Sequence, residues 1–108
     1  MPRTDALQGS LPLLILKILA RRGPLHGYAI ATHIEAASDL LRVEEGSLYP
    51  ALHRLEASGA VRARWRVTEN NRRARSYELT ALGRQQLDSE QQRWTSITAA
   101  IGRVLGQA

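Results

Sequence analysis

The sequence has 108 residues, of which 23% are charged and 44% are hydrophobic, and these values are ordinary for one globular domain. Because it has no cysteine, a disulfide framework and thiolate chemistry are excluded. Its longest apolar run is interrupted by Lys17, is too short to cross a bilayer and lacks the features of a signal peptide. We therefore expect a cytoplasmic protein without a membrane partner, and the net charge of +5 favours a polyanion.

The first helix is predicted over about residues 11–22, after a loose arm at residues 1–7. Ser10 is a suitable N-cap, and Pro12 then falls in the first turn, where proline is tolerated. Apolar residues lie on both sides of this helix, which predicts burial against the core on one side and against a second subunit on the other. Gly23 ends the helix.

Two further helices are predicted before the next glycine stop at Gly59. The spacing of apolar residues indicates one over about residues 27–37. Pro50 places the start of the other near Gly46 or Ser47, because proline deep in a helix costs about 3 kcal/mol. The inward stripe of this third helix consists of Leu48, Leu52 and Leu55. Its outer faces carry Ser47, Tyr49, Pro50, His53 and Arg54.

Residues 62–75 carry the whole net charge of the chain, because they contain six arginines and one glutamate while the remainder is balanced. Basic and apolar residues alternate over residues 61–68, which predicts a half-buried strand with guanidinium groups on its exposed face. Trp65 lies on the apolar face, and we expect it to pack on the core. Residues 70–73 predict a turn, since asparagine tolerates left-handed backbone angles, and residues 75–79 predict the returning strand.

A long last helix is predicted from the N-cap Thr80 to about Leu105. Its apolar residues are mostly three, four or seven positions apart, and a helix that cannot bury this stripe alone requires a second copy of the chain. We assign residues 1–80 to one domain and residues 81–108 to a dimerisation helix. The expected dimer interface consists of Leu11, Leu14, Leu87, Trp94, Ile97, Ile101, Val104 and Leu105.

The predicted order of three helices, a hairpin and a long helix is that of a winged helix-turn-helix, a mainly α fold with a small β-hairpin. The major groove of B-DNA admits a helix, and a basic hairpin beside it reaches phosphates or the adjacent minor groove. The N-terminus of the third helix also favours a phosphate, because its free N–H groups and dipole attract anions. Double-stranded DNA is therefore the expected partner, and residues 1–80 are the expected DNA-binding domain.

Three motifs occur in order along the chain. Residues 23–28 (GPLHGY) form the entry to the second helix, and residues 45–52 (EGSLYPAL) open the third. The third motif consists of Arg75, Tyr77, Leu79, Thr80 and Gly83. Together they resemble the PadR-like transcriptional regulators, over about residues 11–105. The resemblance implies a homodimeric repressor that binds inverted repeats, and the single C-terminal helix resembles the short branch of that family.

The predicted DNA contacts are Tyr28, Ser47, Tyr49, Pro50, His53, Arg54, Arg64, Arg66, Asn71, Arg72, Arg73 and Arg75. Several have competing roles. Ser47 is equally suited to cap the third helix, and the phosphate contact of Tyr28 is implied by the resemblance, with a half-buried spacer as the alternative. Arg54 either reads a base edge, contacts a phosphate or pairs with Glu45 or Glu56.

Trp94 is expected to fill the dimer core. The resemblance also implies a second role, in which such a tryptophan stacks a planar hydrophobic ligand between subunits. His26 and His33 are seven residues apart, too far for the i, i+4 spacing of helical metal sites, so no metal or cofactor is expected. No catalytic motif is present, and we expect no enzyme. A protein-interaction module and a small-molecule carrier are the rival classes.

Overall fold

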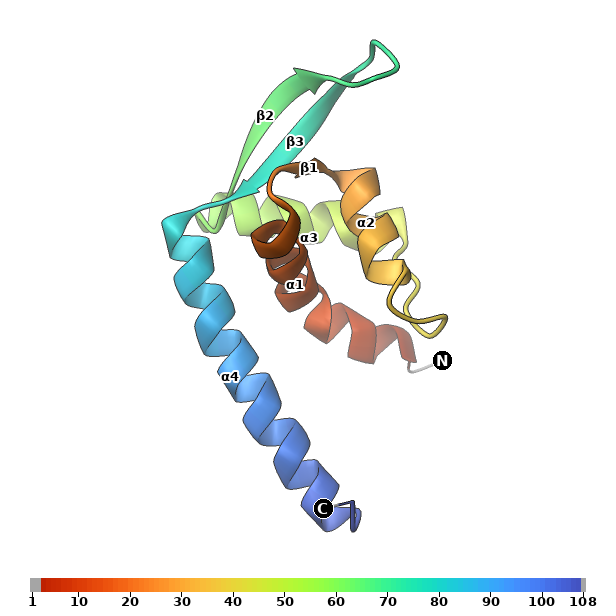
Figure 1. Ribbon diagram of the computed structural model, residues 1–108, viewed down its shortest axis with the longest axis vertical. Helices are drawn as coiled ribbons and strands as arrows, with labels where there is room; N and C mark the ends of the chain where they lie inside the picture. The colour runs from red at the N-terminus through yellow and green to blue at the C-terminus, as the bar shows by residue number, and fades with distance from the viewer. Residues whose placement is uncertain (1–2, 108) are drawn as a thin grey trace.

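A computed structural model describes residues 3–107. Figure 1 shows a group of packed helices, a hairpin that projects from them, and a long last helix that leaves on the other side. The elements are α1 (Arg3–Arg22), β1 (Leu25–His26), α2 (Gly27–Glu35), α3 (Glu45–Ala57), β2 (Val61–Val67), β3 (Arg73–Leu79) and α4 (Ala81–Val104). This arrangement confirms the predicted mainly α, winged helix-turn-helix fold.

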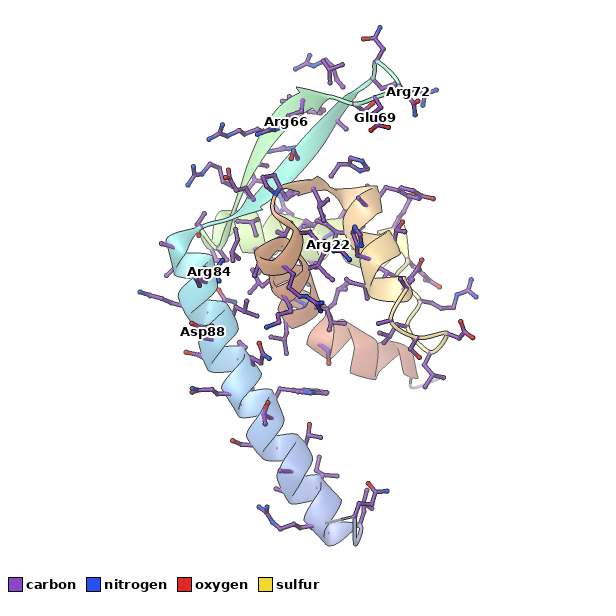
Figure 2. All side chains as sticks on the ribbon, in the orientation of Figure 1. Arg22, Arg66, Glu69, Arg72, Arg84 and Asp88 are labelled. Atoms are coloured by element: carbon purple, nitrogen blue, oxygen red, sulfur yellow. The ribbon has the colours of Figure 1, made fainter. Side chains whose placement is uncertain are left out.

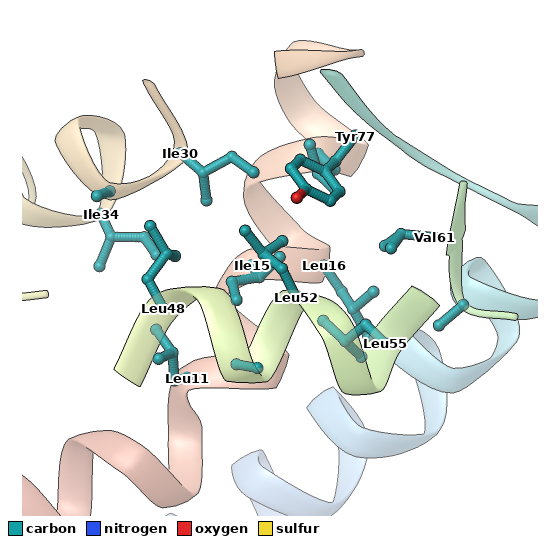
Figure 3. Packing of buried hydrophobic residues seen from close by; sticks show 14 of the residues in the cluster. Leu11, Ile15, Leu16, Ile30, Ile34, Leu48, Leu52, Leu55, Val61 and Tyr77 are labelled. Carbon is teal, nitrogen blue, oxygen red and sulfur yellow. The ribbon is translucent and has the colours of Figure 1, made fainter. Parts of the chain in front are cut away.

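The core lies where α1, α2 and α3 meet beneath the sheet, as Figure 3 shows. The inward stripe predicted for the third helix is confirmed, because Leu48, Leu52 and Leu55 are all buried. Helix α1 contributes Leu11, Ile15, Leu16 and Leu19, and α2 contributes Ile30 and Ile34. These aliphatic side chains hold the three helices in fixed relative positions, and so determine which face of α3 is left to solvent.

The prediction for the start of α1 is wrong. The helix begins at Arg3, so residues 3–7 are helical, whereas residues 1–2 of the predicted arm lie outside the described residues. Ser10 and Pro12 therefore lie inside the helix. Proline lacks an N–H group and interrupts the helical hydrogen bonding, and Figure 1 shows α1 as two segments that point in different directions.

The sheet contains a strand that periodicity did not predict. The strand order is β1-β3-β2, and β1 pairs antiparallel with β3 through Leu25 with Tyr77 and His26 with Ser76. Two residues are too few to show an alternating pattern. The His26 side chain is also the N-cap of α2, since its Nδ1 accepts a hydrogen bond from the Ala29 N–H over 3.4 Å.

The hairpin is confirmed, with β2 and β3 in antiparallel register from Val61 opposite Leu79 to Val67 opposite Arg73. Asn71 has a φ of 60°, the left-handed conformation predicted for an asparagine in this turn. The Thr68 carbonyl accepts a hydrogen bond from the Asn71 N–H over 2.9 Å and closes the turn. We call residues 61–79 the wing.

The joint between the wing and α4 is held by Thr80, which is confirmed as the N-cap. Its Oγ1 accepts a hydrogen bond from the Gly83 N–H over 3.0 Å and donates to the Gly59 carbonyl over 2.6 Å. Gly59 ends α3 with a φ of 85°, a conformation that favours glycine. The hydroxyl therefore connects the end of α3 to the start of α4 and sets the direction in which α4 leaves the domain.

Candidate nucleic-acid interface

The outer face of α3 presents polar and aromatic side chains to solvent. Pro50, His53 and Arg54 are exposed, and Tyr49 retains 44% of its surface. Ser47 is half-buried within the first turn and is not the N-cap, which is Glu44. The capping role predicted for Ser47 is therefore wrong, because the helix begins two residues before it, at Glu45.

Tyr49 also packs against the start of α2. A Cβ atom at position 27 would lie 2.9 Å from both the Oη and the Cε1 of Tyr49, so only a glycine leaves room for the ring. Tyr49 is thus held against Gly27 with one side of its ring exposed. The neighbouring Tyr28 is 74% exposed, which excludes the half-buried alternative considered for it.

The arginines of the wing lie on two faces rather than one. The register places Arg62, Arg64 and Arg66 on one face of the hairpin, and places Arg73 and Arg75 on the other with Trp65. Figure 2 shows Arg66 and Arg72 in the distal part of the hairpin, away from the helices. Among the wing arginines that were predicted to contact DNA, Arg64, Arg66, Arg72 and Arg73 are exposed.

The prediction that Trp65 packs on the core is wrong. Only Val61 and Ala63 of the apolar face of β2 pack on the core, because the distal half of the wing extends beyond it. Trp65 is 57% exposed, and two guanidinium groups lie over its ring, those of Arg73 at 5.1 Å and Arg75 at 5.7 Å from the centroid. These distances are typical of cation–π contacts.

Arg75 is engaged with α3. Its Nη2 lies 2.8 Å from Glu56 Oε2, in an ion pair whose side chains are 40% and 35% exposed. Glu56 therefore pairs with Arg75 and not with Arg54, for which no ion pair is present in the described part of the chain. The pKa of Tyr77 is raised by burial, an effect larger than the lowering caused by Arg75. Glu56 and Tyr49 raise this pKa by smaller amounts.

Helix α4 carries a row of exposed apolar side chains. Trp94, Ile97 and Ile101 retain 52%, 46% and 53% of their surface, and Val104 and Leu105 are more exposed still. By contrast, Leu11 and Leu87 are only 2% exposed, in the core of their own subunit, so they have almost no surface to offer a second one. Leu14 is half-buried against that core.

A cavity of about 390 Å³ lies between α1 and α4 beside Trp94. Its walls are Gly9, Ser10, Leu13, Glu90, Arg93, Trp94 and Ile97. The structure thus brings polar groups to Trp94 that periodicity along α4 did not reveal, since Ser10 comes from another helix.

Within residues 3–107 no group of three potential metal ligands is found, and no helix is long and apolar enough to cross a membrane.

The sequence and the fold match known proteins. The pattern of the PadR-like family of transcriptional regulators matches residues 15–89. A transcriptional regulator from Clostridium thermocellum is 27% identical with a TM-score of 0.81, and 92% of this chain and 96% of that one are covered. A PadR-like transcriptional regulator from Bacillus cereus is 25% identical with a TM-score of 0.80, and 94% and 96% are covered.

One curated relative is 44% identical over 96 residues, the uncharacterized 37.1 kDa protein in transposon TN4556 of Streptomyces fradiae. The match covers 89% of this chain but only 25% of the relative, so the chain spans about a quarter of that protein. The family match extends over most of the chain, from the middle of α1 into α4, and includes the whole wing. The chain therefore belongs to the PadR-like family of transcriptional regulators.

Proposed function

We propose that the chain is a homodimeric repressor that binds an inverted-repeat operator. The observation that carries this proposal is the exposed outer face of α3 together with a wing whose residues 62–75 hold the whole net charge of the chain. Helix α3 enters the major groove, and the arginines of the wing contact phosphates or the adjacent minor groove. The proposed contacts are Tyr28, Ser47, Tyr49, Pro50, His53, Arg54, Arg64, Arg66, Asn71, Arg72 and Arg73.

Two subunits meet, in this proposal, through α4. The exposed row from Trp94 to Leu105 supports it, because a large apolar surface on a helix is stabilised by burial against another chain. A symmetric pair of α3 helices reads two half-sites about 34–36 Å apart, or a multiple of that distance. The direction in which α4 leaves the domain then sets the operator spacing.

Selection of bound sequences from a random duplex pool tests DNA binding and the symmetric dimer at once. We expect an enriched inverted repeat whose half-sites are separated by about one helical turn or a multiple of it. Binding should weaken steeply with salt, because phosphate contacts release counterions. If no sequence were enriched, or if binding were insensitive to salt, the result would instead support a protein-interaction module.

Replacing Arg72 and Arg73 with alanine provides a matched variant, since both side chains are exposed and neither forms an ion pair in the described part of the chain. The Arg73 guanidinium lies over the ring of Trp65, which is itself largely exposed, so we expect its loss to change stability little. The double variant should keep the melting temperature of the wild type and lose most of its operator affinity. Reporter expression from the selected operator, with and without the protein, separates repression from activation.

A second function is favoured by the cavity beside Trp94. We propose that a planar hydrophobic molecule stacks on Trp94 and releases DNA by stabilising one arrangement of the subunits over the other. In a Trp65→Phe background, Trp94 is the sole tryptophan, and its fluorescence should be quenched by such compounds at concentrations that reduce operator binding. Equal effects on operator binding in a Trp94→Ala variant would overturn this role.

A further inference from the structure

Three side chains connect the wing to α3, and we call them the clamp: Glu56, Arg75 and Trp65. Glu56 lies near the end of α3 and accepts a hydrogen bond from Arg75 Nη2 over 2.8 Å. Trp65 and Arg75 are directly opposed on β2 and β3, with the Arg75 guanidinium 5.7 Å from the centre of the ring. Arg75 therefore contacts the helix and the opposite strand of the hairpin at once.

Arg75 is held differently from the other arginines of the wing. Its side chain is 40% exposed, and its Nε is buried with no hydrogen-bond partner in the described part of the chain. Arg64, Arg66 and Arg72 are exposed. Arg73 also lies over the Trp65 ring, but it is exposed and has no ion pair in the described part of the chain. A guanidinium that is partly buried and bonded to a carboxylate has less capacity for a phosphate than one that projects into solvent.

The distal wing needs a contact of this kind. Trp65 is 57% exposed and Val67 is 66% exposed, so the core does not support this half of the hairpin. A two-stranded hairpin is only marginally stable by itself in water. Without the clamp, the distal wing would adopt several orientations relative to α3, and only some of them place both elements on one duplex.

We propose that the clamp fixes the orientation of the wing relative to α3, so that Arg75 is a positioning residue rather than a contact to DNA. This inference rests on the proposed function. Its physical basis is preorganisation: the apparent affinity for an operator falls in proportion to the fraction of molecules that hold the competent wing orientation. An ion pair of this exposure changes that fraction by at most about five-fold per subunit, or about 25-fold for a dimer with two wings.

The Glu56→Gln variant distinguishes the clamp from simple electrostatics, because the two predict opposite changes in operator affinity. It removes a negative charge from a protein that binds a polyanion, so electrostatics alone would strengthen binding. Loss of the clamp weakens it. Because Glu56 is half-buried and its replacement keeps the shape of the side chain, we expect the variant to fold, and a thermal melt followed by circular dichroism checks this.

The experiment measures operator affinity at several salt concentrations for the wild type and for Glu56→Gln, Trp65→Leu, Arg75→Ala and Arg72→Ala. We expect the first three variants to bind more weakly with an unchanged salt slope. Arg72→Ala is the control for a lost phosphate contact, and its slope should fall by about 1.8 for the two subunits.

Two results would overturn the clamp. One is a Glu56→Gln protein that binds as tightly as the wild type or more tightly, and the other is an Arg75→Ala slope that falls as much as that of Arg72→Ala. In either case the wild type still binds, and the proposed function stands. A wild type that binds no duplex would overturn both proposals together.

Discussion

Gly83 lies directly against the carbonyl oxygen of Ala60, at the point where α4 leaves the wing. A Cβ atom at position 83 would collide with that oxygen and would lie 2.8 Å from Leu79 Cδ1 and 2.9 Å from the Ala60 carbonyl carbon. Because the first obstacle is backbone, the strain cannot be relieved by rotating a side chain. This close contact lets α4 begin immediately after β3, with Thr80 as its cap.

We predict that Gly83→Ala lowers the free energy of unfolding by about 3 kcal/mol, because overpacking against backbone forces the two elements apart. Urea denaturation measures the change. Gly46→Ala is the matched control: a Cβ there meets no atom within 4 Å, and its effect should be neutral or slightly stabilising. Equal stabilities for wild type and Gly83→Ala would show that the joint is not tight in solution.

Gly27→Ala should weaken operator binding while changing stability little. The added methyl group displaces the Tyr49 ring, which is the far end of a side chain and can move, so the strain in the fold is small. The proposed DNA contact of Tyr49 is then lost. Fluorescence anisotropy with labelled operator measures the effect, and in a Tyr49→Ala background Gly27→Ala should have no further effect. Independent, additive losses would contradict a mechanism that acts through Tyr49.

The raised pKa of Tyr77 predicts a loss of stability in alkali. Its ordinary pKa is 10.0, and burial raises the value in the folded protein. Above pH 10.0 the unfolded chain therefore loses the phenolic proton while the folded chain retains it, so the free energy of unfolding falls as the pH rises toward the folded pKa. Urea denaturation at a series of alkaline pH values should show a smaller decline for Tyr77→Phe. Identical declines would exclude Tyr77 as the source.

Replacing Ile97 and Ile101 with aspartate should convert the proposed dimer to a monomer. Both side chains lie in the exposed apolar row of α4, and charges there cannot be buried against a second helix. Sedimentation equilibrium measures the mass. Ala99→Asp is the control, because position 99 lies on the opposite side of the helix and is exposed. A wild type that sediments as a monomer would contradict the proposed dimer directly.

Local patterns along the chain were sufficient to predict much of this protein. The period of Leu48, Leu52 and Leu55 determines the buried side of α3, because residues three and four apart share one face of a helix. The alternation in β2, the turn at Asn71 and the Thr80 cap are likewise local effects of side-chain chemistry. The concentration of charge in residues 62–75, and hence the expectation of a polyanionic partner, follows from the order of residues along the chain.

Only the tertiary structure decided how far the core reaches. Trp65 has the same place in the alternating pattern as Val61, yet Val61 is 2% exposed and Trp65 is 57% exposed, because no helix lies beneath the distal wing. Glu56 pairs with Arg75 and not with Arg54 because β3 brings Arg75, nineteen residues further along the chain, beside α3. The fit of Tyr49 on Gly27 has the same origin. Periodicity reports which face of an element is apolar, whereas the opposing element that covers it is set by the packing of distant segments.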